Sequence, residues 1–124
     1  MSKIEIKGVL GKSGDVDVFL GFASARLLFE LSKSDVLDEM TGKGYQRRFN
    51  EQHSLDFRRY IQRPTSTTIP LTFNLRKKRG SEWRIEQNSN MAILSLDSSR
   101  KELYRVDCQH RLGHLSDLEV ILPF

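Results

Sequence analysis

The spacing of apolar residues changes along the chain, and this change constrains the fold more than any other feature of the sequence. Residues 3–9 alternate apolar and charged side chains, and residues 69–75 alternate apolar and polar ones. A period of two residues is typical of a half-buried β-strand. Ala25, Leu28 and Phe29, in contrast, recur at helical spacing. The order predicts an α+β fold: a mixed β-sheet with a helical segment between N-terminal strands and a C-terminal set of strands.

The same patterns set the expected boundaries of the elements. We expect helices from Ala23, at 50–62 and at 108–116, and strands at 3–9, 17–22, 69–75, 82–87, 91–96, 102–106 and 118–124. Ser34 is expected to cap a further helical turn, with Asp35 and Asp38 near the positive end of its dipole. Turns are expected at 11–14 and 88–90, and hairpin turns at 76–80 and 97–100.

The length of 124 residues predicts one domain, residues 1–124. The lone Cys108 excludes a disulfide framework. No apolar run has the length of a signal peptide's core or of a membrane span, so we expect a cytoplasmic protein without a membrane partner.

The charged residues are segregated along the chain, although the formal net charge is only +4. Residues 15–39 hold six acids and two bases, whereas residues 42–84 hold eleven bases and three acids. A segregated basic segment is typical of a protein with an anionic partner, and DNA is the partner we expect. The alternative is a solvated face with a solubilising hairpin tip. The expected DNA-binding residues are Arg48, Arg58, Arg59, Arg63, Arg76, Lys77, Lys78 and Arg79.

One segment, Asp107-Cys108-Gln109-His110-Arg111, is a candidate anion-binding site, because it lies where a strand is expected to end and a helix to begin. Free N–H groups at a helix start favour an anion, and His110 and Arg111 add donors for a phosphate. Two alternatives stay open. Asp107 is an ordinary helix cap, or Cys108, His110 and His114 share a zinc ion.

The same segment resembles the Asp-Gly-Gln-His-Arg-Leu signature of the DGQHR-domain family, whose DndB branch regulates DNA phosphorothioation systems. Gly44 to Arg48 is similar to that family's Gln-Arg element. The resemblance implies a ParB/sulfiredoxin-like fold and a nucleotide or phosphate pocket, with ATP or another nucleotide and Mg²⁺ as candidate ligands. Cys108 stands where the family has glycine, and its Cβ restricts the close approach of a ligand. The pocket residues that it implies are Gln46, Arg47, Asp107, Gln109, His110 and Arg111.

These observations predict a DNA-binding regulator or accessory protein of a DNA-modification or phage-defence system. The alternative is a metal-dependent nucleotide hydrolase or nuclease, in which Asp107 holds the metal and Arg111 the phosphate. A third hypothesis is an interaction module without a working pocket. Family members are longer than this chain, so the resemblance also implies the N-terminal portion of a longer protein, and a homo-oligomer is compatible with each hypothesis.

Overall fold

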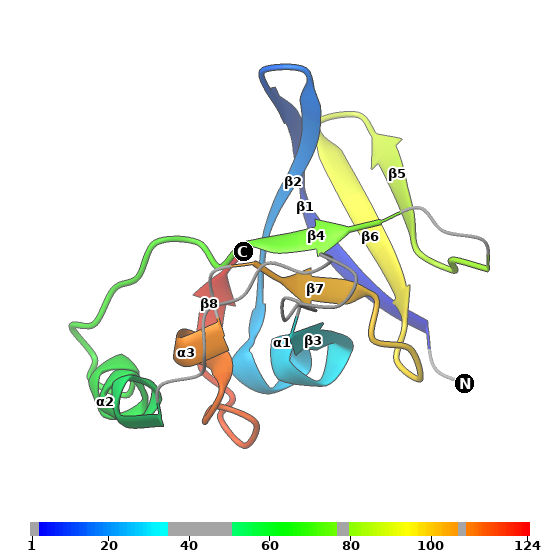
Figure 1. Cartoon of the computed structure of the whole chain (residues 1–124). Helices are drawn as coiled ribbons and strands as arrows, with labels where there is room; N and C mark the ends of the chain where they lie inside the picture. Colours follow the sequence, from blue (N-terminus) through cyan, green and yellow to red (C-terminus); the bar gives the residue numbers. More distant parts are fainter. Residues whose placement is uncertain (1–2, 35–50, 77–79, 107–108) are drawn as a thin grey trace.

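Two β-sheets that cross one another form the framework of the protein (Figure 1). The structure is a computed structural model and describes residues 3–34, 51–76, 80–106 and 109–124. The predicted α+β class is confirmed, but the strands form two sheets in place of the one mixed sheet that was predicted, and most strand pairs are antiparallel. The elements are β1 (Lys3–Ser13), β2 (Val16–Ser24), α1 (Ala25–Leu31), β3 (Ser32–Ser34), α2 (Glu51–Ile61), β4 (Phe73–Leu75), β5 (Arg84–Asn88), β6 (Met91–Asp97), β7 (Leu103–Arg105), α3 (Gln109–Leu112) and β8 (Ile121–Pro123).

The larger sheet has the strand order β5-β6-β1-β2-β8, and all of its neighbours are antiparallel. The predicted strands at 3–9 and 17–22 are confirmed, but both extend further toward the turn that joins them. Ser13 lies opposite Val16, so the turn is Gly14 and Asp15 and not residues 11–14. Gly14 has a φ of +63°, which glycine adopts without the steric cost of a Cβ.

The smaller sheet has the strand order β3-β7-β4, in which β3 runs parallel to β7 and β4 antiparallel to it. Ser34 lies in β3 opposite Arg105 of β7, and the helical turn that it is predicted to cap, with Asp35 and Asp38, lies outside the described residues. Ser32 is the first residue of β3 and is buried, and its hydroxyl donates a hydrogen bond to the Leu28 carbonyl of α1.

Helix α1 begins two residues later than predicted, because Ala23 and Ser24 complete β2. The Ser24 hydroxyl caps the helix by accepting a hydrogen bond from the Leu27 N–H at 3.1 Å. The N–H groups of Ala25 and Arg26 donate to carbonyls of Val120 and Leu118 at 2.8 and 2.9 Å. The C-terminal segment thus satisfies donors that a helix start leaves open.

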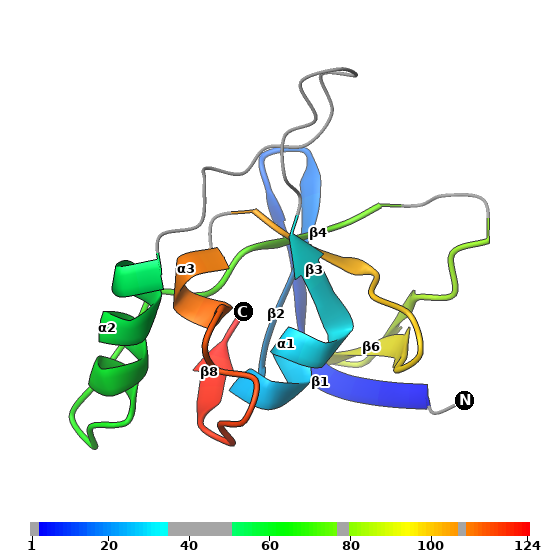
Figure 2. The ribbon, with the colours of Figure 1, turned by 60° about the horizontal axis from the view of Figure 1, so that its bottom comes forward.

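The core lies between the two sheets and α1 (Figure 2). Leu28 of α1, Leu94 of β6 and Leu103 of β7 are each at most 2% exposed. The Phe124 ring lies 6.1 Å from both Phe19 of the larger sheet and Phe73 of the smaller one. These rings join the two sheets into one core.

Two predicted hairpins are wrong. β4 does not pair with β5, and β6 does not pair with β7, because each pair is divided between the two sheets. β6 is paired on both edges, by β1 and β5, so β7 has no edge of β6 to join. The predicted turn at 88–90 is confirmed and joins β5 to β6.

The remaining elements are near their predicted places. β6 is one residue longer than the predicted 91–96, β5 starts two residues later than predicted and ends one later, and the others are shorter. The helix predicted at 50–62 is confirmed as α2, but α3 is one turn long. The strand predicted at 69–75 is confirmed over Phe73–Leu75, and the strand predicted at 118–124 over Ile121–Pro123. No helix in the described ranges is both long and apolar enough to cross a membrane.

Candidate nucleic-acid interface

The smaller sheet turns a polar face away from the core. In β7 the side chains of Leu103 and Arg105 are buried, whereas Tyr104 between them points outward. The strand register places Lys33 of β3 and Asn74 of β4 on either side of Tyr104. This outward face, with Arg76 two residues beyond Asn74, is cationic at both of its edges.

Tyr104 gathers two of these cations. The Lys33 ammonium lies 4.9 Å and the Arg76 guanidinium 4.4 Å from the centroid of its ring. A cation at such a distance is attracted to the negative face of the ring, by about 0.5–1 kcal/mol at an exposed site. The ring therefore holds both cations close together on the face of the sheet.

A hollow of about 250 Å³ opens beside Tyr104. Its described lining holds four cations and one carboxylate, a net positive charge of three. A concave surface of one sign of charge raises the local concentration of ligands of the opposite sign. The lining residues are Lys33, Arg76, Gly80, Ser81, Arg100, Lys101, Glu102 and Tyr104.

Hydrogen bonds to main-chain carbonyls fix two of the lining cations. Arg100 Nη1 donates to the Gly80 carbonyl at 2.6 Å, and Lys101 Nζ donates to the Glu30 carbonyl at 2.7 Å. The turn before them is closed by Asp97, whose carboxylate accepts from the Ser99 hydroxyl and N–H. The Ser99 hydroxyl holds the pKa of Asp97 below its usual range.

Glu102 is the one carboxylate in the described lining. Its Oε2 accepts a hydrogen bond from the Glu82 N–H at 3.2 Å, whereas Oε1 is buried and has no hydrogen-bond partner within the described residues. A buried carboxylate oxygen is costly unless positive charge compensates for it. The charge of Glu102 reduces the repulsion among the four cations and helps to keep them in one place.

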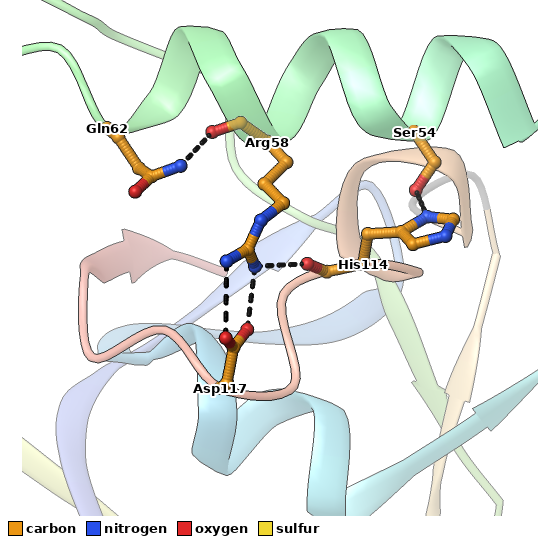
Figure 3. A network of polar contacts seen from close by, with 5 residues as sticks. All are labelled: Ser54, Arg58, Gln62, His114 and Asp117. Carbon is orange, nitrogen blue, oxygen red and sulfur yellow. Dashed lines mark hydrogen bonds and ion pairs between the residues drawn. The ribbon is translucent and has the colours of Figure 1, made fainter.

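Among the cations predicted for DNA, Arg58 is half-buried between α2 and the C-terminal segment and bonds to groups of the protein (Figure 3). Its guanidinium donates to both carboxylate oxygens of Asp117, at 2.6 and 3.2 Å, and to the His114 carbonyl at 2.7 Å. The hydrogen bond between the two side chains raises the pKa of Arg58 and lowers the pKa of Asp117. Arg58 thus fastens α2 to the loop after α3.

Arg59 and Arg63 of the predicted DNA-binding set are exposed and lie at and beyond the end of α2. Arg59 is 3.8 Å from Asp56 on the same helix, a pair that contributes little at the surface. Neither residue lines the hollow, so among the described members of that set only Arg76 contributes to its lining. Arg48 and Lys77 to Arg79 lie outside the described residues.

The predicted phosphate pocket is described in part. Gln46, Arg47, Asp107 and Cys108 lie outside the described residues, as do the side chains of Gln109 and His110. Arg111 Nη1 donates to the Ile69 carbonyl at 2.7 Å and to the Thr68 hydroxyl at 3.1 Å. Arg111 therefore ties α3 to the segment before β4.

His114 of the zinc alternative also has partners within the protein. Its Nδ1 shares a hydrogen bond with the hydroxyl of buried Ser54 at 2.9 Å (Figure 3). Its Nε2 lies 3.6 Å from the Glu51 carboxylate. Over the described residues, no group of three or more His, Cys, Asp or Glu side chains is arranged to hold a metal ion.

Comparison with known proteins gives no relative. No family model, no curated protein and no solved structure matches the chain. Arguments about function therefore rest on the site itself.

Sequence reasoning predicted Arg76 but missed the three other cations of the lining, Lys33, Arg100 and Lys101, and the ring of Tyr104. The adjacent pair Arg100-Lys101 after an Asp-Ser-Ser turn was a local signal of an exposed cationic tip. Nothing in the sequence brings Lys33 to the same place, because that juxtaposition depends on the parallel pairing of β3 with β7.

Proposed function

We propose that the protein binds DNA through the cationic hollow beside Tyr104, as a cytoplasmic regulator or accessory protein of a DNA-modification or phage-defence system. The observation that carries DNA binding is the net positive charge of the hollow, whose lining holds four cations, two of them against the ring of Tyr104. The DndB-like role, a ParB/sulfiredoxin-like fold and a nucleotide pocket at residues 107–111 are supported by the resemblance of Asp107 to Leu112 to the DGQHR signature.

The size of the hollow favours a backbone phosphate over a complete nucleotide. Pockets for drug-sized ligands have volumes of about 300–1,000 Å³, and the hollow is smaller, at about 250 Å³. It is also open beside exposed lysines and an exposed arginine, as a site for a continuous strand must be. Each phosphate that these cations neutralise releases counterions, which favours binding at low salt.

The experiment is fluorescence anisotropy of a labelled DNA duplex across a series of salt concentrations. The K33A/R76A double variant should bind about tenfold more weakly at low salt, with a salt slope reduced by roughly two. The matched control is R59A/R63A, which removes the same charge from two exposed positions at and beyond the end of α2, outside the hollow. The proposed interface is wrong if both double variants lose affinity equally or if neither does.

The regulatory role needs a second measurement with the same protein. Duplexes of one sequence, with and without phosphorothioate linkages, should differ in affinity if the protein serves a modification system. Equal affinity for the two duplexes would leave DNA binding in place and contradict the modification role.

A further inference from the structure

The larger sheet has an apolar face that points away from the core. Residues directly opposite one another in an antiparallel pair lie on the same face of a sheet, as do residues two apart on one strand. Val9 lies opposite Leu20, and Phe22 lies opposite Pro123. Since Leu20 and Phe22 are two apart on β2, all four side chains share one face, which we call the outer face.

Three further apolar side chains extend the outer face. Ile121 lies opposite Ser24, two residues beyond Phe22, and Val16 lies at the other end of β2. Met91 is two residues from Ile93, which lies opposite Lys7, itself two residues from Val9. The outer face therefore runs across β6, β1, β2 and β8.

These residues are exposed to a degree that is unusual for their type. Phe22 is 68% exposed, Ile121 60%, and both Val9 and Leu20 53%. Among the described residues, six of the eight large apolar side chains reported as exposed lie on the outer face: Val9, Val16, Leu20, Phe22, Met91 and Ile121. The other two, Tyr60 and Ile69, lie away from this sheet.

The opposite face of the same strands is already covered. Ile6, Ala23, Leu94 and Leu122 point inward and are each at most 7% exposed. An antiparallel sheet with one solvated face normally places polar residues on that face. The strands of this sheet instead carry apolar residues on both faces, as strands do when a second layer covers each face.

The charges on the outer face balance. Among its strand positions are three bases, Lys3, Lys7 and Arg84, and three acids, Glu5, Glu86 and Asp97. A neutral face gives no attraction to DNA or to an anionic membrane. A mixture of both signs is self-complementary when the same patch meets itself across a two-fold axis.

The area is also suited to a second copy. The six exposed side chains present roughly 600 Å², at the top of the ~300–600 Å² that the largest apolar patch of a monomer reaches. A standard interface buries about 800 Å² on each partner, which the surrounding polar residues of the sheet can complete.

We propose that this outer face is the interface of a homodimer, in which the larger sheets of two copies pack face to face with Leu20 and Phe22 near the two-fold axis. The inference goes beyond DNA binding and does not depend on it. The smaller sheet packs on the inner side of the larger one (Figure 1). The hollow beside Tyr104 lies on the outward face of the smaller sheet, so the dimer leaves both hollows accessible.

The test is the mass of the full chain in solution, measured by light scattering and sedimentation equilibrium over about a hundredfold range of concentration. The parent protein should have twice the chain mass of 14.4 kDa. F22E and L20E should each raise the dimer dissociation constant at least tenfold. I69E is the matched control, because Ile69 is 72% exposed but lies outside the sheet, and this variant should stay dimeric.

Three results would overturn the proposal. The first is a parent protein that is monomeric at every concentration. A monomer that binds vesicles of neutral lipid through the outer face belongs to this result, because the face would then serve a membrane and not a second copy. The second is a dimer that tolerates F22E and L20E, and the third is a dimer that I69E dissociates equally. Near-ultraviolet circular dichroism checks that each variant is folded. If F22E and L20E fail to fold, the milder V9T and F22S variants are compared with I69S in the same assay.

Discussion

The two sheets of this protein share one core but present opposite chemistry to the outside. The outward face of the smaller sheet carries Lys33 and Arg76 around Tyr104, whereas the outer face of the larger sheet carries Leu20 and Phe22. Both sheets obey the same alternation, since every second residue of each points into one core. The inward residues of both sheets therefore specify the fold. The outward residues decide what each sheet can bind: anions on the smaller sheet, and another apolar sheet on the larger one.

The largest expected effect is on the free energy of unfolding, and it distinguishes the inward face of the larger sheet from its outer face. Leu94→Ala should lower the free energy of unfolding by about 2–5 kcal/mol, because Leu94 is 1% exposed and its loss leaves a cavity. Leu20→Ala should cost far less when measured on the monomer, since Leu20 is 53% exposed. Urea unfolding at high dilution compares the two variants. If both lose the same free energy of unfolding, the outer face is covered within one chain.

A smaller effect is expected at Tyr104. Tyr104→Ala should weaken DNA binding two- to fivefold, because two cation–π contacts of about 0.5–1 kcal/mol position Lys33 and Arg76. Tyr104→Phe keeps the ring and should bind like the parent. Anisotropy at one salt concentration compares the three proteins, and equal loss in both variants would assign the effect to the hydroxyl group instead.

The smallest expected effect concerns the ion pair of Arg58 and Asp117, which lies on neither the outer face of the larger sheet nor the outward face of the smaller one. The bond from Arg58 lowers the pKa of Asp117, so this carboxylate stabilises the fold above its unfolded pKa of about 3.9, and that contribution is lost as pH falls through the lower folded pKa. Asp117→Asn should therefore melt at a lower temperature than the parent at neutral pH, and the difference should disappear in acid. A difference that is constant with pH would contradict the role of the charge. DNA binding and dimer mass at neutral pH should not change.

Local patterns were sufficient for much of the fold. The alternation in residues 3–9, the helical spacing before Ile61 and the Ser89-Asn90 turn each depend on neighbouring residues, and each was predicted at its place. The partners of the strands were not predictable in this way. β4 and β7 follow β-like sequence, but their assignment to a second sheet depends on β6 being paired on both edges.

The candidate site shows the same limit. Arg76 was identified because it belongs to a run of four basic residues. Lys33 follows a helix in an acidic stretch, and only the parallel pairing of β3 with β7 brings it to Tyr104. Arg58 and Arg111 were expected to face anions, but each contacts carbonyl groups of segments far along the chain, which sequence spacing does not reveal.

The last seven residues have a consequence for biosynthesis. Carbonyls of Leu118 and Val120 accept from the first N–H groups of α1, and Phe124 exchanges two 2.9 Å hydrogen bonds with Gly21 of β2. The Pro123 carbonyl accepts from the Leu71 N–H at 3.0 Å. We expect that the core cannot close on the ribosome until residues 118–124 have left the exit tunnel. Nascent chains stalled before that point should stay sensitive to protease, and protection should appear in one step as this segment emerges.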